Sequence, residues 1–234
     1  MSKEIYEACC KNVKELKSKR KMIIRLFNEA LRKNSRQEIE FLTKIYALFY
    51  SAYAECSFQK LINTPNGFEQ SIIDDIQKQR NLEEKWIKCV DLALTHIGDC
   101  KEKGIIANKS QSLKRILNKY IITPSQIRNK IAHGQWAECL NNDCSDLNHH
   151  ITGEIKKLDF VKLDRLFTVY DMYQQCIVDL IVSPKTHYRD FYSLMVRIEE
   201  YIRYTKDWDI ETKREQLADS SKMITYKQCR NLKK

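Results

Sequence analysis

Glycine, proline and long uncharged apolar runs are all scarce in this sequence. Its 234 residues include 5 glycines and 3 prolines, too few for an all-β sandwich or barrel, which needs a turn about every eight to twelve residues. No uncharged apolar run approaches the roughly 20 residues of a membrane span, and the charged segment 1–20 lacks the apolar middle of a secretory signal. We therefore expect long helices and a cytoplasmic location.

The nine cysteines are not arranged as a recognisable ligand set. Their number is odd and no two of them form a Cys-x-x-Cys pair, which indicates reduced thiols. One cluster has residue types that zinc can use: Cys139, Cys144, His149 and His150. Its spacing matches no common zinc motif, and no second cysteine pair supports it. We expect neither a metal ion nor another cofactor.

Apolar residues make up 43% of the chain and recur at helical spacing through most of it. The pattern predicts helices over 3–33 with a break near Arg20, 37–62, 68–103 with an interruption, 110–120, 160–182 and 186–205. Segment 37–62 is apolar nearly all round, so it should be the central helix. Gly104 should close the third region, and Ala137–Ile155 should be a loop. The sequence predicts one all-α, up-and-down helical bundle over residues 1–205, with a basic, flexible tail over 206–234.

Basic residues outnumber acidic ones by 41 to 31, which gives a formal net charge of +10 and a pI near 9.1. Such a balance favours a polyanionic partner such as nucleic acid. The positive charge concentrates in two clusters: Lys17, Lys19, Arg20, Lys21 and Arg25, and then Lys222, Lys227, Arg230, Lys233 and Lys234. The alternative explanations are a solvated helix face for the first cluster and a frayed tail for the second.

The segment Thr123–Gly134 carries the start and stop signals of one short helix. Thr123 is a good N-cap, Pro124 suits the first helical position, and Gln126 completes a capping box with Thr123. Gly134 can adopt the left-handed conformation that ends a helix. We therefore predict a helix of about ten residues between Thr123 and Gly134.

Three polar residues of this segment, Arg128, Asn129 and His133, are not explained by its narrow apolar stripe. Asn129 and His133 are four residues apart and share a helix face, with Arg128 beside them around the axis. A histidine titrates near neutrality and can give or take a proton, and an arginine can hold a phosphate through two hydrogen bonds. Metal-free RNA cleavage needs such groups to move the 2′-hydroxyl proton and to stabilise the oxyanion. The alternative is a helix end with a surface arginine and a histidine that bonds the last carbonyls.

The stretch Arg128–Trp136, with the sequence RNKIAHGQW, resembles the signature of HEPN domains. These all-α bundles carry Arg-x4-His with a polar residue, here Asn129, directly after the arginine. The run Ile177–Thr186 resembles the downstream helix and break of one bacterial branch, and the similarity spans residues 41–201. The resemblance implies a HEPN-like fold.

The resemblance further implies a metal-independent endoribonuclease that acts as a homodimer, with the motif helices of both copies facing one composite cleft. Arg128, Asn129 and His133 would be its catalytic residues, and its RNA product would carry a 2′,3′-cyclic phosphate. Such domains serve as toxins or antiphage defence effectors, so an antitoxin or another regulatory protein is an implied partner. Relatives silenced by a nucleotidyltransferase antitoxin carry a tyrosine two residues after the histidine. Gln135 stands there, so we do not expect that mode of control.

Further residues are candidates for the same site. Glu55 is the only charged side chain within residues 45–59 of the most apolar helix, and a carboxylate in such a place should be paired. It either bonds Arg128 or Asn129 and fixes the active-site helix, or it pairs elsewhere or reaches solvent. Aromatic residues beside a helix can stack an unpaired base but are also commonly core. The candidate RNA contacts are Lys130, Trp136 and Tyr120.

Two other function classes fit the sequence. A non-catalytic helical module uses the same surface to bind RNA or a partner protein and forms no products. A basic amphipathic protein at a membrane surface needs a helix with a wide exposed apolar face. The apolar faces of this chain are committed to the predicted bundle, so we expect no membrane partner.

Overall fold

The computed structural model describes the backbone of residues 3–95 and 103–218 and, apart from 103–105 and 184–189, their side chains. Its helices are α1 (Lys3–Arg32), α2 (Arg36–Ile62), α3 (Gln70–Gln77), α4 (Leu82–Thr95), α5 (Lys103–Leu117), the π-helical turn η1 (Asn118–Ile122), α6 (Thr123–Ala132), α7 (His149–Lys156), α8 (Phe160–Val182), α9 (Pro184–Tyr204) and α10 (Ile210–Ala218). The described residues form no strand, only an isolated bridge between Leu140 and Leu147. The predicted all-α bundle is confirmed.

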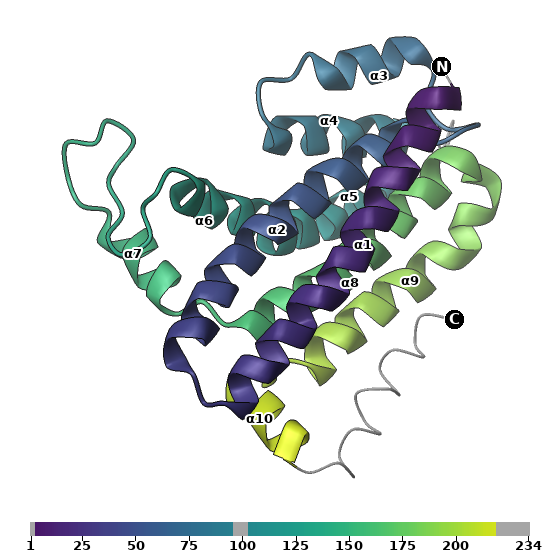
Figure 1. The fold of residues 1–234 in the computed structure, drawn as a ribbon. Coiled ribbons are helices and arrows are strands. Elements are labelled where there is room, and N and C mark those ends of the chain that lie inside the picture. Colours follow the sequence, from purple (N-terminus) through teal and green to yellow (C-terminus); the bar gives the residue numbers. More distant parts are fainter. Residues whose placement is uncertain (1–2, 96–102, 219–234) are drawn as a thin grey trace.

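The long helices α1, α2, α8 and α9 form the body of the bundle (Figure 1). α2 packs against α1, α8 and the motif helix α6. α3 and α4 cover one end of the bundle, and α10 lies at the other end against α1 and α8. The loop after α6 and the short helix α7 extend from one side. α2 is therefore the central helix, as predicted, and it is the element that positions α6.

Aromatic side chains fill the contact between α2 and α8. The rings of Tyr46 and Phe160 stack with their centroids 4.0 Å apart. The hydroxyl of Tyr53 donates to Asp171, and that of Tyr170 donates to a backbone carbonyl of α2 at 2.7 Å. Buried rings stabilise a core most when their polar tips are also bonded, so these contacts hold α2 in one position on α8.

α1 runs unbroken from Lys3 to Arg32, so the predicted break near Arg20 is wrong. Nη2 of Arg20 donates to the carboxylate of Asp164 at 2.7 Å and its Nε donates to the hydroxyl of Tyr46 at 3.0 Å, while that hydroxyl donates to Asp164. Burial disfavours the charged guanidinium, but Asp164 and Tyr46 outweigh it and hold the pKa of Arg20 above its ordinary value. The charge at Arg20 therefore joins α1 to α2 and α8 instead of interrupting the helix.

Two predictions about connecting segments are wrong. Gly104 lies in the first turn of α5 and does not close the preceding region, because glycine weakens a helix without forbidding it. The predicted loop 137–155 contains most of α7. Asn148 nucleates this helix, since its side chain accepts a hydrogen bond of 3.0 Å from the backbone N–H of Ile151.

The beginning of the predicted tail is also helical. α10 (Ile210–Ala218) packs on α1 and α8. The N–H of Ile210 donates at 2.9 Å to Asp159, the same carboxylate that caps α8. This shared cap anchors α10 to the bundle, so the part of the predicted tail up to Ala218 is ordered helix. The tail from residue 219 onward lies outside the described residues.

α6 continues directly from α5 and η1. Thr123 has helical backbone angles and its hydroxyl donates to the carbonyl of Asn118 at 2.9 Å. The predicted N-cap at Thr123 and its capping box are wrong, because no free helix N-terminus exists there. Pro124 has no N–H to bond the carbonyl of Tyr120, and this carbonyl accepts instead from the hydroxyl of Tyr50 in α2 at 2.8 Å. The π-helical turn thus accommodates the proline and ties the start of α6 to α2.

Candidate functional site

α6 ends at the motif histidine. His133 is the C-cap residue, and Gly134 follows it with φ +78°, the left-handed conformation predicted for it. The N–H of Gly134 donates to the carbonyl of Ile131 at 3.0 Å, and the N–H of Gln135 donates to the carbonyl of Lys130 at 3.0 Å. These are the paired bonds of a Schellman motif. They hold the backbone of His133 at a defined helix end while its side chain is exposed.

Arg128 reaches from α6 to α2, where its Nη2 binds the carboxylate of Glu55. The predicted contact between Glu55 and Arg128 is confirmed. The same carboxylate oxygen accepts a hydrogen bond of 3.4 Å from the hydroxyl of Ser51, one turn earlier on α2. The exposed fractions of the two side chains are 23% for Arg128 and 49% for Glu55, and Nε of Arg128 is buried without a hydrogen-bond partner among the described residues. The donors that can still serve a ligand are therefore the remaining N–H groups of the two Nη atoms, not the buried Nε–H.

Asn129 and His133 lie on the exposed side of α6, one turn apart. Within the described ranges, neither side chain forms a hydrogen bond or an ion pair. The structure thus brings the three motif residues onto one short helix at the surface. Arg128 is held by α2, whereas the amide and the imidazole face solvent, where they can meet a ligand.

Lys130 and Gln135 hold the loop that follows α6. Nζ of Lys130 donates to the carbonyl of Leu140 at 2.7 Å, and the side-chain oxygen of Gln135 accepts from the N–H of Leu140 at 2.9 Å. The ammonium of Lys130, a candidate RNA contact, already serves the protein's own backbone. Gln135 likewise has a structural role.

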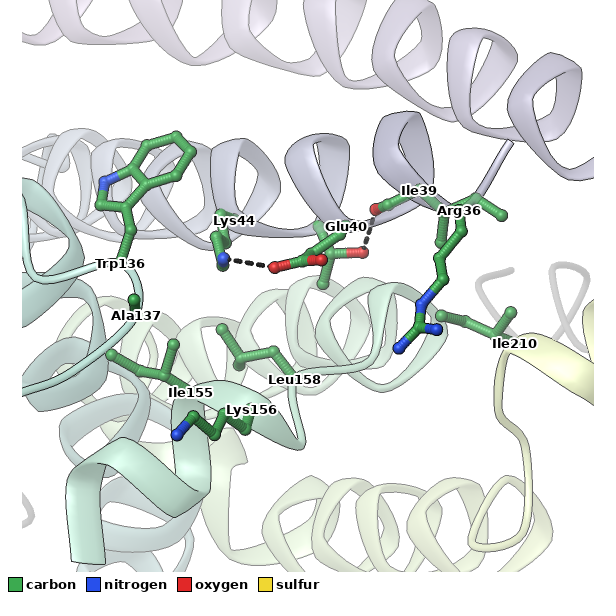
Figure 2. A pocket seen from close by; sticks show the side chains of 11 residues that line it. Arg36, Ile39, Glu40, Lys44, Trp136, Ala137, Ile155, Lys156, Leu158 and Ile210 are labelled. Atoms are coloured by element: carbon green, nitrogen blue, oxygen red, sulfur yellow. Dashed lines mark hydrogen bonds and ion pairs between the residues drawn. The ribbon is translucent and has the colours of Figure 1, made fainter. Parts of the chain in front are cut away.

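Trp136, three residues after the motif histidine, forms one wall of a pocket of about 480 Å³. Its indole N–H donates to the carbonyl of Ile131 at 2.9 Å, which fixes the ring. Figure 2 shows Trp136 at one end of the pocket, Arg36 at the other, and the apolar side chains of Ile155 and Leu158 between them. The pocket therefore combines an aromatic wall, an apolar floor and a cationic end.

Two further cations of this pocket are neutralised by neighbouring carboxylates. Lys44 has its Nζ 5.6 Å from the centroid of Trp136 and binds Glu40 at 2.7 Å. Lys156 binds Glu138 at 2.7 Å. Sequence reasoning missed this pocket. The four-residue spacing from Arg36 to Glu40 to Lys44 was the available signal, since it places all three on one face of α2.

Tyr120 is half-buried, like Trp136, but lines a different pocket, built by η1, α5, α8 and α9. Nζ of Lys119 lies 5.5 Å from the centroid of its ring. The two aromatic candidates are therefore not brought together. Each is partly core and partly surface.

The first basic cluster is largely neutralised within the protein. Four of its members are ion-paired: Lys17 with Asp171, Lys19 with Glu15, Arg20 with Asp164, and Arg25 with Glu29. Paired cations offer little field to a polyanion, so a solvated helix face accounts for most of this cluster. The second basic cluster lies outside the described residues.

Within residues 3–95 and 103–218, no three His, Cys, Asp or Glu side chains are grouped so that they could hold a metal ion. Of the two cysteines in the cluster with zinc-type residues, Cys139 is buried and Cys144 is exposed. Among the same residues no helix is long and apolar enough to cross a membrane.

No family model matches the chain, and no curated protein or solved structure matches it. What the chain does must therefore be inferred from its own residues.

Proposed function

We propose that the chain is a metal-independent endoribonuclease of the HEPN type that acts as a toxin or an antiphage defence effector. The observation that carries this proposal is the face of α6. It presents an exposed imidazole and an exposed amide beside a guanidinium with unused donors. These groups supply what transesterification of an RNA phosphodiester needs without a metal ion.

The proposed reaction begins when the imidazole of His133 takes the proton of a 2′-hydroxyl. The 2′-oxygen attacks the adjacent phosphorus, the bond from phosphorus to the 5′-oxygen breaks, and a 2′,3′-cyclic phosphate and a 5′-hydroxyl result. Arg128 binds the phosphate and stabilises the added negative charge in the transition state, because charge-assisted hydrogen bonds to phosphate are strong. Asn129, one turn from the imidazole, donates to the substrate and positions it.

A second copy of the chain completes the proposed site. One α6 helix supplies one imidazole, but the departing 5′-oxygen also needs a proton. In a homodimer with a composite cleft, the motif of the second copy supplies it. The exposure of Asn129 and His133 supports this arrangement, because both side chains are accessible to a facing helix.

The pocket beside Trp136 supports RNA as the substrate. Its volume of about 480 Å³ falls in the range of small-ligand sites. A nucleobase fits against the indole and the apolar floor, and Arg36 at the far end offers a cation to a phosphate. Two of its lining residues, Trp136 and Ala137, follow the motif directly in the chain, so we expect a nucleoside next to the cut phosphate to occupy it.

The test is cleavage of total RNA by the purified protein in the presence of EDTA. His133→Ala should lower the rate at least about a hundredfold, the usual contribution of a positioned acid or base. His150→Ala is the matched control, since this histidine is also exposed but lies outside the motif on α7. Equal rates for the wild type and His133→Ala would overturn the mechanism.

The biological part of the proposal needs a separate readout. Induced expression of the wild type should stop growth, and His133→Ala should relieve the arrest. Sequencing of RNA ends from arrested cells should show 2′,3′-cyclic phosphates. Growth arrest that persists in the His133→Ala strain would remove the role as an RNase toxin.

One observation favours a second candidate, a module that binds RNA without cleaving it. Glu55 already occupies one donor of Arg128, so the guanidinium is not fully free for a reacting phosphate. Such a module binds RNA equally well after His133→Ala, loses affinity after Arg128→Ala, and yields no products in either case.

A further inference from the structure

A basic groove lies at the junction of α5, η1, α8 and α9, and η1 leads directly into the motif helix α6. Its volume is about 620 Å³. The lining residues are Arg115, Ile116, Lys119, Tyr120, Arg165, Glu199, Ile202, Arg203 and Lys206. Five of these side chains are cationic and one is a carboxylate. The groove therefore carries a concentrated positive charge.

Two of the five cations have structural roles. Arg115 binds Glu199, the one carboxylate of the groove. Nε of Arg165 donates to the hydroxyl of Thr205 at 2.8 Å, and its Nη2 donates to the carbonyl of Ile202 at 3.2 Å. Arg165 thus forms a fixed, partly buried base of the groove at the end of α9.

The other three cations are Lys119, Arg203 and Lys206. All three are exposed, and none forms an ion pair with the part of the chain that the structure describes. This distinguishes the groove from the two other basic regions. Most of the first basic cluster on α1 is ion-paired, and Lys44 and Lys156 of the pocket beside Trp136 each bind a carboxylate.

Tyr120 gives the groove an aromatic surface. Its ring is half-buried, and its backbone is fixed because its carbonyl accepts a hydrogen bond from Tyr50 at 2.8 Å. Lys119 holds its ammonium 5.5 Å from the ring centroid. The ammonium therefore lies over one face of the ring, which leaves the other face for a base. Proteins bind single-stranded nucleic acid by stacking bases on aromatic rings and by binding the phosphates with nearby cations.

We propose that this groove binds single-stranded RNA, with backbone phosphates at Lys119, Arg203 and Lys206 and one base stacked on Tyr120. The role of the groove as a substrate contact rests on the proposed function. The groove adds to that function an RNA-binding surface outside the motif. Tyr120 precedes Arg128 by eight residues and lies in the π-helical turn that leads directly into α6. We expect one RNA strand to contact both residues.

The test measures binding apart from cleavage. All proteins carry His133→Ala, so that a short fluorescent single-stranded RNA stays intact, and anisotropy is recorded with EDTA at several salt concentrations. The groove variant is Lys119→Glu/Arg203→Glu/Lys206→Glu. The control is Lys11→Glu/Lys14→Glu/Lys21→Glu, which makes the same change of net charge at exposed lysines of α1. Circular dichroism melting shows that both variants are folded.

The groove variant should bind RNA at least about tenfold more weakly than the control, and its slope of log affinity against log salt should shrink by about 2, the value for three lost phosphate contacts on a single strand. Tyr120→Phe should keep the affinity, whereas Tyr120→Leu should lower it at least about fivefold, the smallest usual contribution of one stacked base. Equal losses in the groove and control variants would overturn the proposal.

Two further outcomes separate this proposal from its alternatives. Binding to vesicles that contain phosphatidylserine, lost in the groove variant while RNA binding persists, would assign the groove to a membrane surface and overturn the RNA proposal. A wild type that does not cleave RNA, together with the groove effect above, would overturn the proposed nuclease and leave the groove as an RNA-binding site.

Discussion

Arg20 and Arg128 each bind a carboxylate across a helix interface, but the first pair is enclosed and the second is open. Arg20 donates to both Asp164 and Tyr46, and the exposed fractions of the Arg20 and Asp164 side chains are 16% and 15%. Arg128 has Glu55 as its ion-pair partner, and 49% of that carboxylate's side chain is exposed. The same pair of chemical groups therefore occurs in two different settings.

The difference between the two pairs concerns what remains available for a ligand. The guanidinium of Arg20 is held by a carboxylate and a buried hydroxyl, so its effect is on folding. The guanidinium of Arg128 has unused donors and lies next to the exposed side chains of Asn129 and His133. A phosphate can add to it without the loss of a buried network. The comparison predicts opposite mutational signatures for the two arginines.

The largest effect is expected from Arg20→Met. This change removes the guanidinium from the largely enclosed carboxylate of Asp164, which should lower the free energy of unfolding by up to about 3–5 kcal/mol. Urea denaturation followed by circular dichroism measures the loss. The double variant Arg20→Met/Asp164→Leu should recover most of it, because an apolar replacement of both partners leaves no buried charge. Equal losses in the single and double variants would contradict this account of the pair.

The opposite signature is expected from Arg128→Ala. Cleavage should fall by about a hundredfold or more, since one oxyanion donor typically contributes that much. The free energy of unfolding should change by less than about 1 kcal/mol, as for other half-exposed ion pairs. Arg128→Lys is the control for charge alone: it keeps the positive charge but loses the paired donors, so it should restore only part of the activity. Stability that falls as far as in Arg20→Met would break the comparison.

The open site was partly predictable because some of its parts depend on local sequence. Gly134 was expected in the left-handed conformation, and it ends α6 there. Glu55 was singled out because it is an isolated carboxylate on an apolar helix, and it binds Arg128. The N-cap at Thr123 was wrong, because capping depends on whether the preceding residues are helical, and here η1 precedes. Local signals identify a helix end only when neighbouring segments do not extend it.

The enclosed pair and the pockets could not be predicted from the sequence. Arg20 and Asp164 are 144 positions apart, and no periodicity connects them. The pocket beside Trp136 joins Arg36 of α2 to Ile155, which belongs to the segment predicted as a loop. Such sites require the packing of α2, α7 and α8, which depends on contacts between distant segments.

The enclosed network should also make the fold sensitive to alkaline pH. Burial and the neighbouring Asp164 raise the pKa of Tyr46 well above its ordinary value, with Arg20 opposing the shift. Tyr46 therefore stays protonated in the folded chain when the unfolded chain begins to ionise near about pH 10. Its stability contribution is complete below that pH and is lost above it, by about 1.4 kcal/mol per pH unit.

Urea unfolding at a series of pH values around about pH 10 measures this slope. Tyr46→Phe should reduce the slope of the free energy of unfolding against pH by the contribution of one tyrosine, up to about 1.4 kcal/mol per pH unit. Tyr192→Phe is the control, because the exposed fraction of Tyr192 is 52% and its removal should leave the slope unchanged. Identical slopes for both variants and the wild type would mean that Tyr46 does not keep its proton in the folded chain.

The smallest effect is expected from Glu55→Gln, which tests whether the open pair positions Arg128 or merely occupies it. The amide of the glutamine still accepts a hydrogen bond, so the free energy of unfolding should change by less than about 1 kcal/mol. If Glu55 positions the guanidinium, kcat should fall about tenfold with little change in KM, because a displaced Arg128 stabilises the transition state poorly. If Glu55 competes with RNA for the guanidinium, KM should fall instead. Wild-type cleavage together with wild-type stability would show that Glu55 neither positions Arg128 nor competes with RNA for it. The ion pair would then be a surface contact without a role in cleavage.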